Sequence, residues 1–121
     1  MRDHLADLGH QVIWLARDEA WPEVGRQVGE SVAAGEVDRG VVCCYTGTGV
    51  SIAANKVPGV RAALCTDAAT AAGSRRWNDA NVLAMGLRLA SETVASEILD
   101  AFMTTETDQS ERDAVARIES P

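Results

Sequence analysis

The 121-residue chain has few aromatic residues, little basic charge and no long apolar run. Three Trp, one Tyr and one Phe make up only 4% of the residues, so the core must be built from aliphatic side chains. Lysine and arginine number 11 against 18 aspartates and glutamates, a net charge of −7. This argues against nucleic acid as the main partner, because neutralising phosphates requires a basic surface. Neither a membrane span nor a signal peptide is predicted.

Cysteine and histidine are also scarce, and their spacing argues against a metal site. Cys43, Cys44 and Cys65 form an odd set without CxxC spacing, and each lies in an apolar run. A disulfide framework or zinc knuckle is therefore not expected, and a reducing cytoplasm is the natural setting. His4 and His10 are six residues apart and do not share a helix face, so the sequence predicts no metal ligands.

Short apolar runs alternate with helical patterns along the chain, whose length suits one domain. The apolar runs predict strands over 11–15, 40–44, 61–65 and 81–86. Apolar residues at helical spacing predict helices over 1–8, 22–34, 50–56, 67–76, 91–103 and 111–118. This alternation predicts an α/β fold, a three-layer Rossmann-like parallel sheet flanked by helices. Ligands in such sheets bind at the carboxyl ends of the strands, here Leu15, Cys44, Cys65 and Gly86.

The segment from Cys43 to Ser51 joins a predicted buried strand to a helix start. Gly47 and Gly49 allow a sharp turn that exposes backbone N–H groups, and the helix N-terminus adds a partial positive charge. These features predict an anion site in which the thiolate of Cys44 is favoured. Cys43 points to the opposite face and is expected in the core, as is Cys65. The alternative for Cys44 is a buried strand cysteine before an ordinary glycine turn.

Residues 46–86 read TGTGVSIAANKVPGVRAALCTDAATAAGSRRWNDANVLAMG. This stretch closely resembles the ribose-5-phosphate isomerase B / galactose-6-phosphate isomerase family, which shows C-G-T-G-x-G-x-S-I-A-A-N-K, P-G-x-R-A and S-R-x-H-N-D-x-N-V-L. The resemblance extends over roughly residues 5–103. It implies an aldose–ketose isomerase that acts on a phosphorylated sugar without a cofactor. It also implies a homodimer or a dimer of dimers, with the active site at the subunit interface.

The resemblance assigns roles to residues of the glycine-rich segment. In most of the family a cysteine base moves a proton between two adjacent sugar carbons through an enediolate, and Cys44 stands at its position. Thr46 stands where the family's threonine contacts the substrate, and the amides from Gly47 to Gly49 would form the anion hole. The implied substrate-binding residues are Tyr45, Gly47, Thr48, Gly49, Val50, Ser51, Asn55, Trp77 and Asn78. For Asn55 a plain polar helix end stays open as the alternative.

Three departures from the family pattern point to an altered substrate range. Trp77 replaces a histidine that the family assigns to sugar-ring opening, and indole cannot exchange a proton near neutral pH. An open-chain substrate such as a tetrose phosphate would avoid that step. Tyr45 replaces a glycine, and ordinary packing is the alternative for both aromatic residues. Ala114 stands where a phosphate-binding arginine is expected, although Arg112 and Arg117 are near.

The family's first strand, which carries D-H-A-G, has no counterpart here. Asp3 and His4 match only two of its letters, and we expect both on a helix surface. In the family's sheet order, 2-1-3-4-5, the missing strand is central. Either upstream residues are lost from this chain, or the predicted strand 11–15 pairs directly with 40–44. A partner chain could also cover the gap, because unpaired strand edges are costly.

We therefore expect an N-terminally short isomerase-like domain over residues 1–103. A polar linker and a C-terminal helix, over residues 104–121, are expected to form an interface. Because of the departures, a non-catalytic relative or one subunit of a hetero-oligomeric isomerase is the main alternative function. The cysteine and its glycine-rich turn also resemble the phosphocysteine loop of sugar phosphotransferase B domains, which transfer phosphate through the cysteine.

Overall fold

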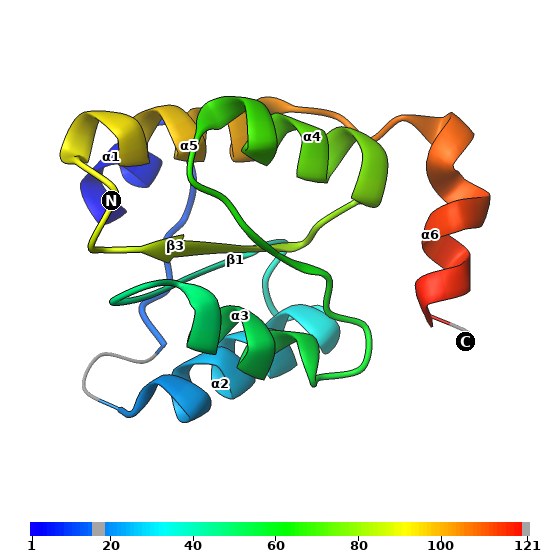
Figure 1. Cartoon of the computed structure of the whole chain (residues 1–121), viewed down its shortest axis with the longest axis horizontal. Helices are drawn as coiled ribbons and strands as arrows, with labels where there is room; N and C mark the ends of the chain where they lie inside the picture. Colours follow the sequence, from blue (N-terminus) through cyan, green and yellow to red (C-terminus); the bar gives the residue numbers. More distant parts are fainter. Residues whose placement is uncertain (16–18, 120–121) are drawn as a thin grey trace.

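A computed structural model of the chain describes residues 1–15 and 19–119. The chain forms a parallel sheet with helices on both faces (Figure 1), so the expected three-layer α/β architecture is confirmed. The strands are β1 (Gly40–Cys44), β2 (Ala62–Leu64) and β3 (Val82–Gly86). Their order is β1-β3-β2, with Gly40 opposite Val82 and Cys44 opposite Gly86. All three carboxyl ends therefore point to the same edge of the sheet.

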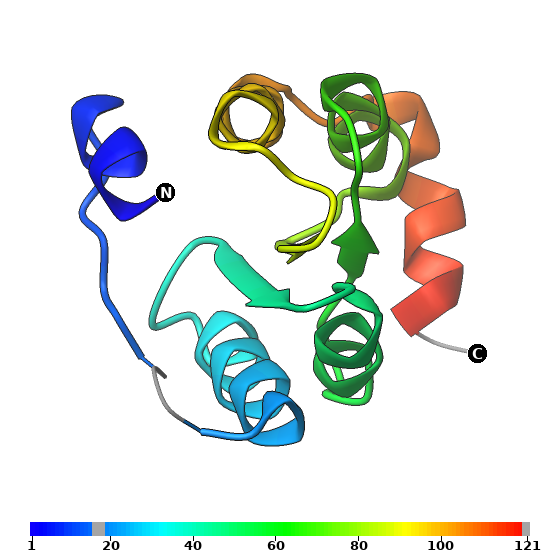
Figure 2. The same cartoon turned by 60° about the vertical axis from the view of Figure 1, so that its left-hand side comes forward.

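Two helices cover each face of the sheet (Figures 1 and 2). On one face α2 (Trp21–Ala33) packs beside α3 (Thr48–Asn55), and on the other α4 (Ala68–Asn78) packs beside α5 (Glu92–Thr104). The short α1 (Arg2–Asp7) lies on the β1 side of the sheet. A 3-10 turn (Gln109–Glu111) leads to α6 (Arg112–Glu119) on the opposite, β2 side. None of the helices in the described ranges is long and apolar enough to cross a membrane.

The core has two halves, one under each helical layer, and β3 separates them. Val82 and Ala84 pack with the valines of α2 and α3, whereas Leu83 and Met85 pack with Ile98, Leu99 and Phe102 on α5. This alternation follows from the period of two along a strand. Every residue of β3 is buried, which is why the run reads as continuously apolar in the sequence.

The order of the strands differs from the family order stated above, which would put the strand near 61–65 in the middle. The structure instead puts β3 in the middle, because it is apolar on both faces and fully buried. Strand β2 has only three residues and lies at an edge. There the Asn55 side chain replaces a neighbouring strand: its Nδ2 donates to the Ala62 carbonyl at 3.0 Å, and its Oδ1 accepts from the Ala62 N–H at 2.8 Å.

The prediction of a strand over residues 11–15 is wrong. This segment follows α1 without joining the sheet, and Ile13, Trp14 and Leu15 are each about half exposed. The apolar run has a local preference for extended backbone, but a strand also requires a partner to pair with. Among the described residues, strand β1 therefore pairs with β3 only, and the alternative in which 11–15 pairs directly with 40–44 does not form.

The expectation for the helix surface at the N-terminus is half right. Asp3 is exposed, but His4 is partly buried, and its Nε2 lies 2.7 Å from the Asp100 carboxylate on α5. Leu5 also packs against the apolar cluster beneath α5. Helix α1 is therefore held to the domain by both polar and apolar contacts.

Two glycines of α2 differ in how closely they approach the neighbouring residues. A Cβ on Gly25 would lie 2.6 Å from Ala53 Cβ and 2.8 Å from the Val50 carbonyl oxygen, so it would push α2 and α3 apart. A Cβ on Gly29 would first meet a Val57 methyl group, at 3.1 Å. We expect Gly25→Ala to lower the free energy of unfolding by about 1–3 kcal/mol, the usual cost of overpacking.

Gly29→Ala is the matched control, because both changes remove the same entropic cost of a helical glycine, about 0.5–1 kcal/mol. Urea denaturation of both variants measures the difference. Equal stability of the two variants, or a Gly25→Ala protein as stable as the parent, would contradict this view of the helix contact.

Candidate active site

Cys44 is the last residue of β1, and the turn that follows it folds back over its sulfur. Gly47 has φ 81°, in the left-handed region that favours glycine, and it precedes the first residue of α3. In this conformation the Gly47 N–H donates to Cys44 Sγ across 3.2 Å. The glycine-rich segment predicted as an anion site therefore does direct a backbone donor at the sulfur.

The three cysteines have different electrostatic surroundings. Partial burial opposes the Cys44 thiolate, but N–H groups of Val50, Gly47, Thr46 and Gly49 outweigh it and lower the thiol pKa from its ordinary value. On the other face of the strand, burial raises the pKa of Cys43 to about 11. Burial also raises the pKa of Cys65. Near neutral pH, Cys44 is the cysteine with the most thiolate.

The residues that follow β3 hold the Cys44 turn in place through backbone hydrogen bonds. The N–H of Leu87 donates to the Cys44 carbonyl and the N–H of Arg88 donates to the Tyr45 carbonyl, both at 2.9 Å. A Cβ on Gly86 would lie only 2.5 Å from the Thr46 carbonyl oxygen, so glycine is required for this close approach. The turn is thus fixed by backbone contacts rather than by side chains alone.

Polar and aromatic side chains surround the turn. Thr46 and Thr48 are exposed, and the Thr48 N–H donates to Thr46 Oγ1 at 3.4 Å. Tyr45 is 67% exposed, and the Arg88 guanidinium lies 6.0 Å from its ring centre. Trp21, at the start of α2, lies against Gly49, where a Cβ would be 2.8 Å from the indole.

The remaining predicted residues of the turn face inward. Val50 is fully buried in the core and Ser51 is 8% exposed. The side chain of Val50 therefore faces away from a ligand at the turn, and its backbone N–H is the group that acts on Cys44.

Trp77 and Asn78 lie far from Cys44 within one chain. They end α4, four residues before Val82 starts β3, whereas the Cys44 turn lies beside Gly86 at the other end of that strand. Four residues of strand span about 13 Å. Asn55 is at the same end as Trp77 and is bonded to Ala62. The structure therefore brings together residues 44–49 but keeps these three residues apart from them.

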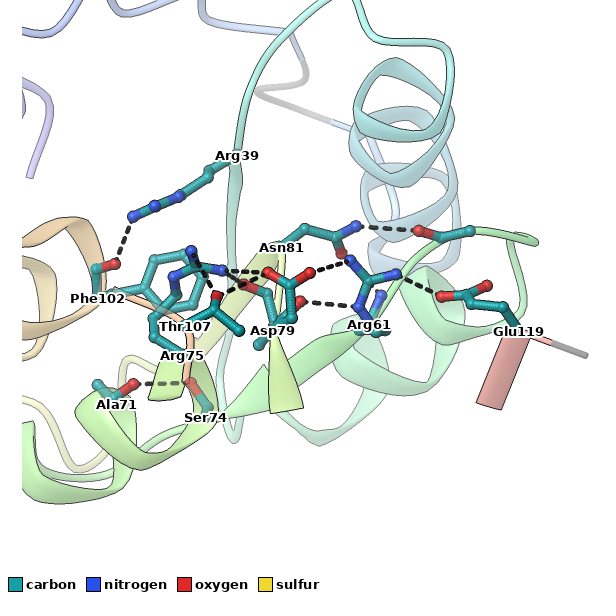
Figure 3. A network of polar contacts seen from close by, with 12 residues as sticks. Arg39, Arg61, Ala71, Ser74, Arg75, Asp79, Asn81, Phe102, Thr107 and Glu119 are labelled. Carbon is teal, nitrogen blue, oxygen red and sulfur yellow. Dashed lines mark hydrogen bonds and ion pairs between the residues drawn. The ribbon is translucent and has the colours of Figure 1, made fainter. Parts of the chain in front are cut away.

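A network of charged side chains fixes the backbone just after Asn78 (Figure 3). Asp79 has φ 49°, and its carboxylate accepts from Arg75 at 3.0 Å, from Arg61 at 3.3 Å and from the Thr107 hydroxyl at 3.1 Å. Arg75 is only 6% exposed and also donates to the Ala80 carbonyl at 2.6 Å. The exposed side chains of Trp77 and Asn78 are thus carried by a rigid turn.

These exposed residues line a groove along the β2 edge. The groove has a volume of about 730 Å³ and also includes Leu64 and Ile118, which are 38% and 58% exposed. Trp77 is 54% exposed and its ring lies over Gly73, where a Cβ would be 2.8 Å away. Large apolar side chains in an open groove are typical of a surface that another molecule covers.

Sequence reasoning missed Trp21, Leu64 and Arg88 as neighbours of the turn. Leu64 is one of them because a Cβ on Gly47 would lie 2.6 Å from its Cδ1. Arg88 follows the carboxyl end of a predicted strand, so the rule that ligands bind at this edge could have identified it. Trp21 precedes a proline at a helix start, and only the packing of α2 against α3 reveals its contact with Gly49. Within residues 1–15 and 19–119, no cluster of three or more metal-ligating side chains is present.

Comparison with known proteins agrees with this architecture. The family model described as Ribose/Galactose Isomerase matches residues 1–120. Ribose-5-phosphate isomerase B of Escherichia coli K12 is 43% identical over 104 residues, which are 83% of this chain and 70% of that protein. The galactose-6-phosphate isomerase subunit LacB of Clostridium acetobutylicum is 43% identical over 105 residues, 84% of this chain and 61% of that protein. Part of each relative thus has no counterpart in this chain.

A solved structure, that of Clostridium thermocellum ribose-5-phosphate isomerase B, superposes with a TM-score of 0.93 at 41% identity. The match covers 98% of this chain and 83% of that chain. Sequence and fold therefore lead to the same conclusion, which confirms the resemblance read from the glycine-rich segment. The chain belongs to the ribose/galactose isomerase family.

Proposed function

We propose that this chain catalyses aldose–ketose isomerisation of a phosphorylated sugar, with Cys44 as the base. The observation that carries the proposal is the Gly47 N–H directed at Cys44 Sγ, 3.2 Å away, in a turn whose amides lower the thiol pKa. The relatives named above are sugar-phosphate isomerases, which supports the same reaction class.

The reaction requires one base and a place for negative charge. The Cys44 thiolate takes the proton from the carbon next to the carbonyl, and the C–H electron pair forms the C1–C2 double bond of an enediolate. The carbonyl oxygen becomes an oxyanion. One hydroxyl proton then moves between the two oxygens, and the thiol returns its proton to the other carbon. No oxidant or reductant is consumed.

The turn supplies the electrostatic stabilisation. N–H groups of Gly47, Thr48 and Gly49, at the start of α3, act as the anion hole for the enediolate oxygens. The exposed hydroxyl of Thr46 orients the substrate. Arg88 lies at the mouth of the turn and provides positive charge for the phosphate, since its guanidinium is always protonated.

A second copy of the chain completes the site. Trp77 and Asn78 are exposed, rigidly held and too far from Cys44 to meet the same ligand in one chain. In a symmetric dimer each copy can bring these residues to the turn of the other. The open groove beside β2 and the C-terminal segment 104–121 are the surfaces proposed for this contact.

A hetero-oligomeric isomerase is the second candidate. It is favoured by the same separation of Trp77 and Asn78 from Cys44, because a different chain could supply the missing groups. The two candidates share the base and the anion hole and differ only in the identity of the partner.

The direct test of the reaction is proton exchange in heavy water with tetrose and pentose phosphates. Cys44→Ala should lose about 10²–10⁴-fold in the rate of exchange between C1 and C2, the usual contribution of a positioned base. The matched control is Cys43→Ala, the neighbouring residue on the opposite strand face. Full exchange in Cys44→Ala, or an equal loss in both variants, would exclude Cys44 as the base.

The proposal that two copies form one site is tested by combining two different variant chains in one dimer. Cys44→Ala and Asn78→Ala chains with different tags are co-expressed, and dimers carrying both tags are purified. Such a hybrid has one site with both defects and one intact site, so it should recover about half of the parental activity. A hybrid as inactive as the two single variants would mean that Cys44 and Asn78 serve the same site within one chain.

A further inference from the structure

Helix α2 approaches α3 along one face, and Trp21 lies at the end of that face nearest the start of α3. Trp21 and Gly25 are four residues apart, so they lie on the same side of α2. A Cβ on Gly25 would lie 2.8 Å from the Val50 carbonyl oxygen. One turn earlier on α2, the Trp21 ring atom Cε3 lies 2.8 Å from where a Cβ on Gly49 would be. The indole therefore meets the first turn of α3.

The flat face of the indole makes this contact. The Trp21 ring atoms Cε3, Cδ2 and Cζ3 lie 2.8, 2.9 and 3.1 Å from the position of a Cβ on Gly49. These three atoms are consecutive in the six-membered ring, and their nearly equal distances mean that the ring faces the backbone rather than meeting it edge-on. A larger residue at position 49 would push the ring away. Glycine therefore lets the indole lie directly on the backbone of α3.

The backbone under the ring carries groups that are directed at Cys44. The N–H groups that lower the pKa of its thiol include those of Val50 and Gly49, which both belong to the first turn of α3. That turn is closed by a backbone hydrogen bond of 3.2 Å from the Ser51 N–H to the Gly47 carbonyl. The first N–H groups of a helix have no partner within the helix, and helix ends fray. The direction of these amides therefore depends on what packs against the turn.

The backbone that carries the indole is itself fixed at the start of α2. The Ala20 carbonyl accepts hydrogen bonds from the N–H groups of Glu23, at 3.0 Å, and Val24, at 3.1 Å. Pro22 lies in the first turn of the helix, where its ring fixes φ at a helical value. Trp21 is 51% exposed, so about half of its side chain packs against the protein. The ring is thus anchored at its base and presses one face on α3.

We infer that Trp21 is a positioning residue of the proposed active site. Its ring holds the first turn of α3 in the conformation that directs the Gly49 and Val50 N–H groups at Cys44. Glycine has the widest conformational range of any residue, so without the ring the turn frays and the sulfur loses part of its hydrogen bonding. The inference rests on the proposed function for its effect on turnover, whereas its effect on Cys44 is measured without substrate.

The test is the pH dependence of Cys44 alkylation by iodoacetamide in position-21 variants, read by mass spectrometry. Because the amides favour the thiolate, Trp21→Ala should raise the Cys44 midpoint by about 0.2–0.7 pH unit, the effect of a helix N-terminus on a nearby anion. Trp21→Phe keeps a flat ring and should keep the parental midpoint. The matched control is Trp14→Ala, which removes another half-exposed indole, from the segment before α2, and should leave the midpoint unchanged.

Thermal melting verifies that each variant folds. If Trp21→Ala does not fold, Trp21→Leu takes its place, because leucine keeps an apolar side chain but has no flat face, and the same rise in midpoint is expected. An unchanged Cys44 midpoint in the folded variant, or an equal rise in Trp14→Ala, would overturn the inference.

The pH dependence of kcat/KM with tetrose and pentose phosphates separates the inference from the proposed function. The acid limb of this profile reports the base in the free enzyme, so with Cys44 as the base Trp21→Ala should shift the limb to higher pH by the same amount. A general loss of stability would lower the rate without moving the limb. A limb that stays in place while the alkylation midpoint moves would exclude Cys44 as the base and leave the position of Trp21 on the turn supported.

Discussion

The proposed active site depends on one backbone contact, between the turn after β1 and the residues that follow β3. The two strands end in register at Cys44 and Gly86, and their pairing continues through the N–H groups of Leu87 and Arg88. Glycine at position 86 leaves room for the Thr46 carbonyl, and glycine at position 47 adopts the left-handed turn. Because both strands are set by the core, the amides around Cys44 are preorganised before any substrate binds.

The same part of the structure gives two adjacent cysteines different thiol pKa values. Cys43 faces the apolar layer under α5, where burial penalises its thiolate, whereas Cys44 faces the start of α3 and its amides. A single strand thus carries, at consecutive positions, one thiol whose pKa is raised and one whose pKa is lowered. The net negative charge of the chain is compatible with the proposed anion site, since local N–H groups and Arg88 provide positive potential at the turn.

Local patterns predicted the features that depend on neighbours in the sequence. The strand 40–44, the glycine-rich turn and most helices were predicted within one or two residues. The prediction of a strand over 11–15 was wrong because strand pairing requires a partner that is distant in the sequence. The central position of β3 likewise depends on its burial from both sides of the sheet. The distance between Cys44 and Trp77 follows from α4 running antiparallel to β3, which motif matching does not encode. A resemblance identifies functional residues, but whether one chain or two assemble them is a question of topology.

The central claim is that the amides of the turn lower the pKa of Cys44 and so favour its thiolate. The most direct measurement is the rate of alkylation of each cysteine by iodoacetamide as a function of pH, read by mass spectrometry. Cys44 should react with a midpoint below the ordinary thiol value of about 8.5, well before Cys43, whose pKa is raised to about 11. A Cys44 midpoint at or above the ordinary value, or equal labelling of both cysteines at neutral pH, would contradict the account.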